Sequence, residues 1–121
     1  MTQHIEAVEG AACTPVLAIR LSSAQTDAIA AAFKAIGHPV RMQILDLIAQ
    51  GGGEVCGCHI ERHFDLTQPT ISHHLRILRD AGLIESESRG VWVHHRVNRA
   101  AMSELQRVLA SLADSESKAS D

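Results

Sequence analysis

The stretch LTQPTISHHLRILRDAGLI, residues 66–84, has the pattern of an amphipathic helix with a defined start and end. Thr67 is a favourable N-cap residue, and Pro69 follows in the first turn, where a helix tolerates a missing N–H. Gly82 comes just after the last turn, as glycine often does at helix ends. Apolar residues recur at the spacing of one helix face, at Ile71, Leu75 and Leu78. The sequence therefore predicts a helix that buries one face.

Polar residues occupy the other side of this helix, because each residue turns the helix by ~100°. Their amide, hydroxyl, imidazole and guanidinium groups are those that hydrogen-bond base edges and phosphates. These residues are Gln68, Thr70, Ser72, His73 and Arg76. An ordinary amphipathic helix with a solvated face would show the same pattern, so this stretch alone leaves both interpretations open.

The composition indicates one small domain with an aliphatic core: 121 residues, of which 45% are hydrophobic and only 2% aromatic. The chain contains no apolar run of about 18 residues and no signal-peptide pattern at its start, which predicts a soluble cytoplasmic protein without a membrane segment. Three cysteines are an odd number, so reduced thiols are expected rather than structural disulfides. The net charge of −3 is low for a DNA-binding protein and favours binding as a dimer.

The order of elements predicts a mainly α fold with a small β-hairpin. Helices are expected over residues 23–36, 39–50, 55–64, 68–81 and 99–113, and alternating residues predict a hairpin over 83–88 and 91–97. Two helices joined by a short turn before a hairpin form a winged helix-turn-helix, with about five helices and a two-stranded wing. We expect a flexible arm over 1–21, the DNA-binding and dimerisation domain over 22–113, and a disordered acidic tail over 114–121.

The predicted wing and the last helix each suggest an interaction. Arg89 lies in the turn of the hairpin, where its guanidinium could contact DNA phosphates. The last helix carries a wide apolar face, formed by Met102, Leu105, Val108, Leu109 and Leu112. Because a domain this small needs less apolar surface than that, the face predicts a homodimer formed with the first helix.

The segments FKAIGHPVRMQILDLI, TQPTISHHLRILRDAGLI and RGVWVHHRV together resemble the ArsR/SmtB family of metal-responsive repressors. The resemblance covers about residues 24–112. It implies a homodimer that binds double-stranded operator DNA through the helix over residues 68–81. Mapped onto this chain, the residues that face DNA are Gln68, Thr70, Ser72, His73 and Arg76, whereas His74 has a structural role.

The segment EVCGCHI, residues 54–60, resembles the metal-binding box of the arsenic and cadmium branches of that family, with Cys56 and Cys58 as its two cysteines. Thiolates are the preferred ligands of soft, thiophilic ions. Side chains at i and i+2 of a regular helix point in nearly opposite directions, so joint binding requires a non-helical turn, which Gly57 allows. A ligand held there would distort the support of the DNA-binding helix and release the DNA.

A third sulfur ligand would decide which ion is bound. Relatives of the arsenic branch place a third cysteine where this chain has Glu61, so Cys13 on the arm is the candidate replacement. Three thiolates suit trivalent arsenic or antimony, and two suit a methylated arsenical. Cadmium or lead binding by four thiolates is one cysteine short. The zinc site of another branch is missing because residues 99–113 contain neither His nor Asp. His59 and His63 form a pair at i and i+4 that is better explained as solvated.

Other functions fit the sequence less well. A dithiol redox or persulfide sensor could use Cys56 and Cys58, although a C-x-C disulfide closes a small, strained ring. A winged-helix module that binds another protein would be expected to carry an apolar face in place of residues such as Gln68 and His73. No phosphate-binding loop, nucleophile motif or pair of carboxylates points to an enzyme or to an organic cofactor.

Overall fold

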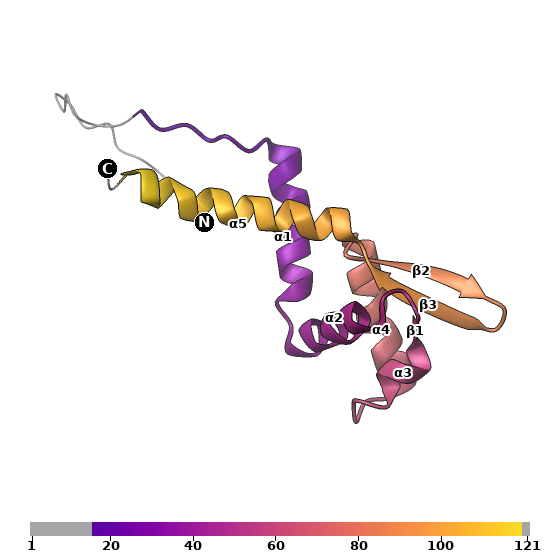
Figure 1. The fold of residues 1–121 in the computed structure, drawn as a ribbon. Coiled ribbons are helices and arrows are strands. Elements are labelled where there is room, and N and C mark those ends of the chain that lie inside the picture. The colour runs from indigo at the N-terminus through magenta and orange to yellow at the C-terminus, as the bar shows by residue number, and fades with distance from the viewer. Residues whose placement is uncertain (1–15, 120–121) are drawn as a thin grey trace.

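The computed structural model describes residues 16–119, and it confirms the winged helix-turn-helix predicted from the sequence. Five helices surround an aliphatic core, and a β-hairpin extends from this helical body (Figure 1). The helices are α1 (Ser23–Ile36), α2 (Pro39–Gly51), α3 (Gly57–Glu61), α4 (Gln68–Asp80) and α5 (Arg99–Ala119). The strands are β1 (Val55–Cys56), β2 (Ile84–Arg89) and β3 (Trp92–Val97).

Local sequence explains where α1 and α2 begin. The Ser22 hydroxyl accepts a hydrogen bond from the Gln25 amide at 3.1 Å, and the Gln25 side chain accepts one in return from the Ser22 amide at 3.0 Å. This reciprocal pair is a capping box, which satisfies N–H groups that have no partner within the helix. Pro39 then starts α2, with the His38 ring as its N-cap.

The helix α4 has the predicted start and the predicted buried face. Thr67 is its N-cap, and its hydroxyl accepts a hydrogen bond from the Thr70 amide at 3.3 Å. The three residues of the predicted apolar face, Ile71, Leu75 and Leu78, are all buried. Gly82 follows the helix with φ +78°, a conformation that glycine adopts without the penalty that other residues incur.

The region around the two cysteines differs from the prediction of one helix over residues 55–64. Val55 and Cys56 form the short strand β1, and α3 covers only Gly57–Glu61. β1 pairs antiparallel with β3, so the wing is part of a three-stranded sheet of order β1-β3-β2 rather than a two-stranded hairpin. The backbone groups of Val55 and Cys56 have partners on β3, at His95 and His94, in place of a helical turn.

The last helix is longer than expected. It runs from Arg99 to Ala119, so residues 114–119, expected as a disordered tail, belong to α5. Leu105 is buried against the core, whereas Leu109 and Leu112 are 54% and 65% exposed in the single chain. None of the helices within residues 16–119 combines the length and the apolar character needed to cross a membrane.

Candidate nucleic-acid interface and thiol site

The outer face of α4 presents the polar residues expected to contact DNA. Gln68, His73 and Arg76 are exposed, and Thr70 and Ser72 are partly exposed. The amide of Gln68 donates a hydrogen bond to the Ser72 hydroxyl at 3.0 Å, and the hydroxyls of Thr67 and Thr70 lie 2.9 Å apart. α4 thus brings all five predicted residues onto one helix. Local hydrogen bonds orient three of them, Gln68, Thr70 and Ser72.

The buried side of α4 is attached to α1 and α2 through His74. The guanidinium of Arg41 donates to the His74 Nδ1 atom at 3.2 Å and, through Nε, to the Ala35 carbonyl at 2.7 Å. Because an arginine only donates, the His74 Nδ1 atom accepts, and its proton is on Nε2. The ring of His38 lies 4.8 Å from that of His74 between centroids. The structural role that the resemblance assigned to His74 agrees with this position.

The environment of His74 favours the neutral ring. Burial lowers the pKa of His74, and the charges of His38, Arg41 and His73 lower it further. A neutral His74 can accept the hydrogen bond from Arg41, whereas an imidazolium cannot. The contact leaves no signal in the sequence, because Arg41 and His74 lie 33 residues apart and neither interrupts a helical pattern.

The wing residue Arg89 is held by two carboxylates. Its guanidinium donates to Glu54 at 2.8 Å and to Glu87 at 3.2 Å, and these two bonds raise the pKa of Arg89, with Glu87 as the larger cause. Glu54 immediately precedes β1, so the ion pair between Arg89 and Glu54 joins the segment that carries the two cysteines to the wing. A DNA phosphate would compete with these carboxylates for the guanidinium of Arg89.

The cysteines of the C-x-C motif are brought together at the junction of β1 and α3. Cys56 has extended backbone angles and is the N-cap of α3, whereas Cys58 is in its first turn, so the two side chains are not both on a regular helix. Their Cα atoms are 5.4 Å apart and their sulfur atoms are joined as a disulfide, which differs from the reduced thiols expected from the sequence. Cys13 lies outside the described residues.

A histidine that the sequence analysis set aside lies beside the two cysteines. One donor atom each from Cys56, Cys58 and His59 lie within 4.8 Å of one another. The Nδ1 atom of His59 accepts the Cys56 amide hydrogen at 3.2 Å, which fixes the ring at the N-terminus of α3. The sequence does carry a signal for this contact. His59 lies three residues after Cys56, and a side chain at that position can reach back to the N-cap residue of a helix. Two sulfurs with a nearby imidazole suit a thiophilic ion.

The sheet connects the thiol site with the wing. Cys56 pairs with His94 of β3, and Val55 pairs with His95. His95 is buried, and its Nδ1 atom lies 2.8 Å from the Ser86 hydroxyl; burial lowers its pKa, with Arg79 and His94 adding to the effect. β1 and β3 are hydrogen-bonded neighbours, so Cys56 belongs to the same sheet as the wing.

Comparisons with known proteins agree with this architecture. Residues 38–86 match the arsR family of bacterial regulatory proteins. An uncharacterised HTH-type transcriptional regulator of Methanocaldococcus jannaschii is 38% identical, over 66% of this chain and 89% of its own length. The transcriptional repressor SdpR of Bacillus subtilis is 38% identical, over 60% of this chain and 78% of its own. The arsenical resistance operon repressor of the same organism is 38% identical, over 54% of this chain and 62% of its own.

Two solved structures show the same fold. An ArsR-like transcriptional regulator from Rhodococcus superposes with a TM-score of 0.67 at 20% identity, covering 78% of this chain and 88% of that one. The homodimeric winged helix-turn-helix domain of a possible ArsR-family regulator from Mycobacterium bovis superposes with a TM-score of 0.59 at 29% identity. The match covers 79% of this chain and 84% of that one. These relatives are transcriptional regulators and not enzymes. The chain belongs to the ArsR family and is a transcriptional repressor with a winged helix-turn-helix DNA-binding fold.

Proposed function

We propose that this repressor binds operator DNA as a homodimer and leaves it when trivalent arsenic or antimony binds Cys56 and Cys58. The observation that carries the proposal is the position of these two cysteines. Their sulfur atoms are adjacent at the start of α3, the helix that precedes α4 in the helix-turn-helix. The family includes arsenical resistance operon repressors from several bacteria, which supports an arsenical as the inducer.

The DNA-binding unit in this proposal is the winged helix-turn-helix of residues 22–113. The exposed face of α4 reads the operator through Gln68, Thr70, Ser72, His73 and Arg76, and Arg89 contacts phosphates from the wing. The apolar residues Leu109 and Leu112 of α5 are exposed in the single chain, which supports a dimer built on this helix. The neighbouring structure from Mycobacterium bovis is itself homodimeric.

An ion bound at the two cysteines lowers the affinity for DNA through the elements that the thiol site joins. An ion held by Cys56 and Cys58 fixes β1 and the first turn of α3 relative to each other. α3 packs on α4 and β1 pairs with β3, so both DNA-contacting elements respond to the same event. A ligand shifts the equilibrium by its differential affinity for the DNA-free arrangement, so tight binding to both arrangements alike would have no effect.

Direct binding measurements test this function. In reduced full-length protein, arsenite and methylarsonous acid are titrated against the fluorescence of Trp92, the only tryptophan in the chain. Cys56→Ser and Cys58→Ser should each abolish binding of both compounds. If Cys13 is the third ligand, Cys13→Ser should weaken binding of arsenite but not of the methylated compound, which offers only two exchangeable positions. Unchanged binding of arsenite by Cys56→Ser and Cys58→Ser would overturn the proposal.

A redox-sensing repressor is a second candidate, because the structure joins Cys56 and Cys58 as a disulfide. In that case peroxide or a persulfide would release DNA, and arsenite would not. Mass spectrometry of the peptide that contains both cysteines, together with operator binding before and after peroxide, separates the two functions.

A further inference from the structure

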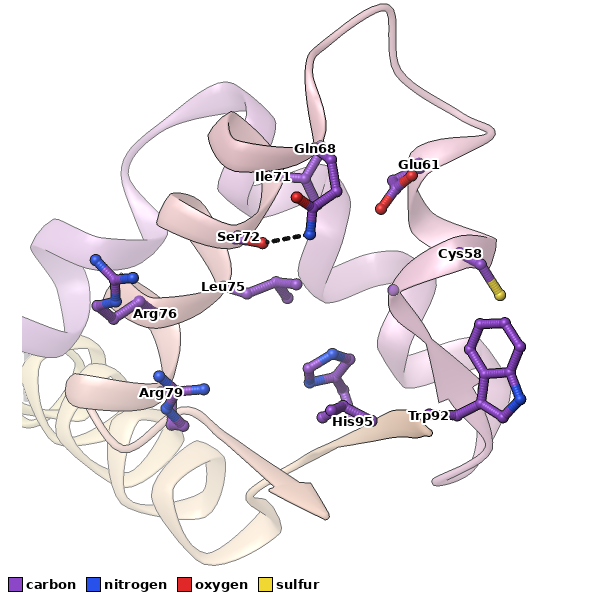
Figure 2. Close-up of a pocket in the computed structure, with 12 residues that line it drawn as sticks. Cys58, Glu61, Gln68, Ile71, Ser72, Leu75, Arg76, Arg79, Trp92 and His95 are labelled. Atoms are coloured by element: carbon purple, nitrogen blue, oxygen red, sulfur yellow. Dashed lines mark hydrogen bonds between the residues drawn. The ribbon is translucent and has the colours of Figure 1, made fainter. Parts of the chain in front are cut away.

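A cavity of about 520 Å³ opens beside the thiol site, where α3, α4 and β3 face one another. Figure 2 shows Cys58 and Glu61 on α3, the side chains of α4 across from them, and Trp92 and His95 on β3. Both elements expected to contact DNA, α4 and the wing, therefore line a space that is also bordered by a cysteine. This volume is within the range of small-molecule sites.

Four apolar side chains line the cavity, together with the carboxylate of Glu61 near Cys58. Ile71 and Leu75 contribute buried aliphatic side chains from α4, and Trp92 and Val93 contribute from β3. Trp92 is 55% exposed and Val93 41% exposed, so neither side chain is used to fill the core. In Figure 2 the sulfur of Cys58 and the indole of Trp92 lie on the same side of the cavity. An exposed indole beside a cysteine offers a flat apolar surface to a thiol-bound ligand.

The far side of the cavity is cationic. Arg76 and Arg79 of α4 line the end of the cavity opposite Trp92 (Figure 2). Neither guanidinium has an ion pair among those found in the described residues, unlike Arg89 and Arg96. This end of the cavity therefore suits a polar or anionic substituent on a ring whose apolar part lies near Cys58.

From this arrangement we propose that the cavity is a binding site for the organic group of a trivalent arylarsenical that is held by Cys56 and Cys58. The inference rests on the proposed function, because it uses the same two sulfurs, and it adds the chemical class of the inducer. An aryl group occupies the one position on arsenic that the two thiols leave, so a third thiol is not required.

The chemistry balances without an added oxidant. A small-molecule thiol first reduces the Cys56–Cys58 disulfide and is itself oxidised to a disulfide. The two thiols then displace both hydroxyl groups of an arylarsonous acid. Two As–O bonds break, two As–S bonds form, and the thiol protons leave in two molecules of water. Arsenic stays trivalent, and its bond to the aryl carbon is untouched.

The test compares two arsenicals that differ only in the organic group. Reduced full-length protein is dialysed against methylarsonous acid or phenylarsonous acid, and bound arsenic is quantified by mass spectrometry. Both compounds use two thiols, so the ratio of their dissociation constants isolates the contribution of the ring. Trp92→Ala should lower the preference for the phenyl compound about tenfold, as expected when a ring loses one apolar wall. Trp92→Phe should retain most of it.

Val91→Ala is the matched control, because Val91 is an exposed apolar residue of the wing turn that does not line the cavity. It should leave the preference unchanged. The same ratio in the wild type, Trp92→Ala and Val91→Ala would overturn the inference while leaving the proposed function intact. If the wild type binds arsenite but neither organic compound, the inference fails and the proposed function stands; if it binds none of the three, the proposed function itself fails. In the wild type, phenylarsonous acid should also change the emission of Trp92 more than methylarsonous acid does.

Discussion

Cys56 lies directly opposite His94 in the antiparallel pair of β1 and β3, and His94 in turn lies opposite Glu87 of β2. Side chains of directly opposite residues lie on the same face of a sheet. The Nδ1 atom of His94 is buried and has no hydrogen-bond partner, the only such side-chain atom found within the described part of the chain. The cysteine proposed to sense the inducer and the wing proposed to contact DNA are therefore parts of one sheet.

The affinity of the wing for DNA should depend on whether Arg89 binds its carboxylate partners or DNA phosphates. Arg89→Gln should weaken binding to all sequences alike and reduce the slope of log affinity against log salt by about one. Glu54→Gln removes a competing carboxylate and should strengthen binding. Electrophoretic or fluorescence titrations at several salt concentrations measure both effects. Arg96→Gln, which loses only a pair with Glu85, is the control. A change of base preference in Arg89→Gln would contradict this role.

His73 should read bases rather than phosphates. Its ring is exposed on the outer face of α4, so His73→Ala should leave the fold intact. The substitution should cost about 1–3 kcal/mol at particular base positions of an inverted repeat whose half-sites are about one helical turn apart. Binding to a panel of single-base operator variants measures this effect. Equal weakening on every variant would assign His73 to the phosphates instead.

The dimer should depend on the exposed apolar residues of α5. Leu109 is 54% exposed, so Leu109→Glu should fold but sediment as a monomer with weak operator binding. Leu105 is buried, and Leu105→Glu should lower stability as well, because the core cannot solvate a carboxylate. Ser103→Glu, exposed on another face of α5, is the control. Sedimentation of Leu109→Glu as an intact dimer would place the interface elsewhere.

Stability should fall with acidification because of His74. The pKa of His74 in the folded protein is below its ordinary value of 6.5, so the unfolded chain takes up a proton first as the pH falls. The contribution of the neutral His74 ring to the free energy of unfolding is fully present above pH 6.5. It is lost as the pH falls from 6.5 towards the lowered pKa. Burial of His95 acts in the same direction.

Urea unfolding at pH values on both sides of that window measures the effect. The unfolding midpoint should fall towards acidic pH, and His74→Gln should show a smaller fall, because glutamine can still accept a hydrogen bond from Arg41 but does not titrate. His63→Gln, an exposed histidine, is the control. An identical pH dependence in the wild type and His74→Gln would show that another group is responsible.

Sequence alone predicted the elements whose patterns are long and regular. The cap at Thr67, the apolar stripe of α4 and the hairpin all follow from local preferences, and all are present. The strand β1 was missed because two residues show no periodicity, and its pairing with β3 depends on a partner about 40 residues away. Contacts such as Arg41 with His74 and Arg89 with Glu54 are likewise set by the tertiary fold and leave no local signal.

In the proposed function, Cys56 and Cys58 together couple the binding of arsenic to the release of DNA. The most direct measurement is the fluorescence anisotropy of a labelled operator bound to reduced protein, during titration with arsenite. Arsenite should lower the anisotropy of the wild-type complex. Protein carrying both Cys56→Ser and Cys58→Ser should bind the operator equally well and hold it throughout the titration. Release of the operator from that double variant at the same arsenite concentration as from the wild type would show that these two cysteines do not sense arsenic.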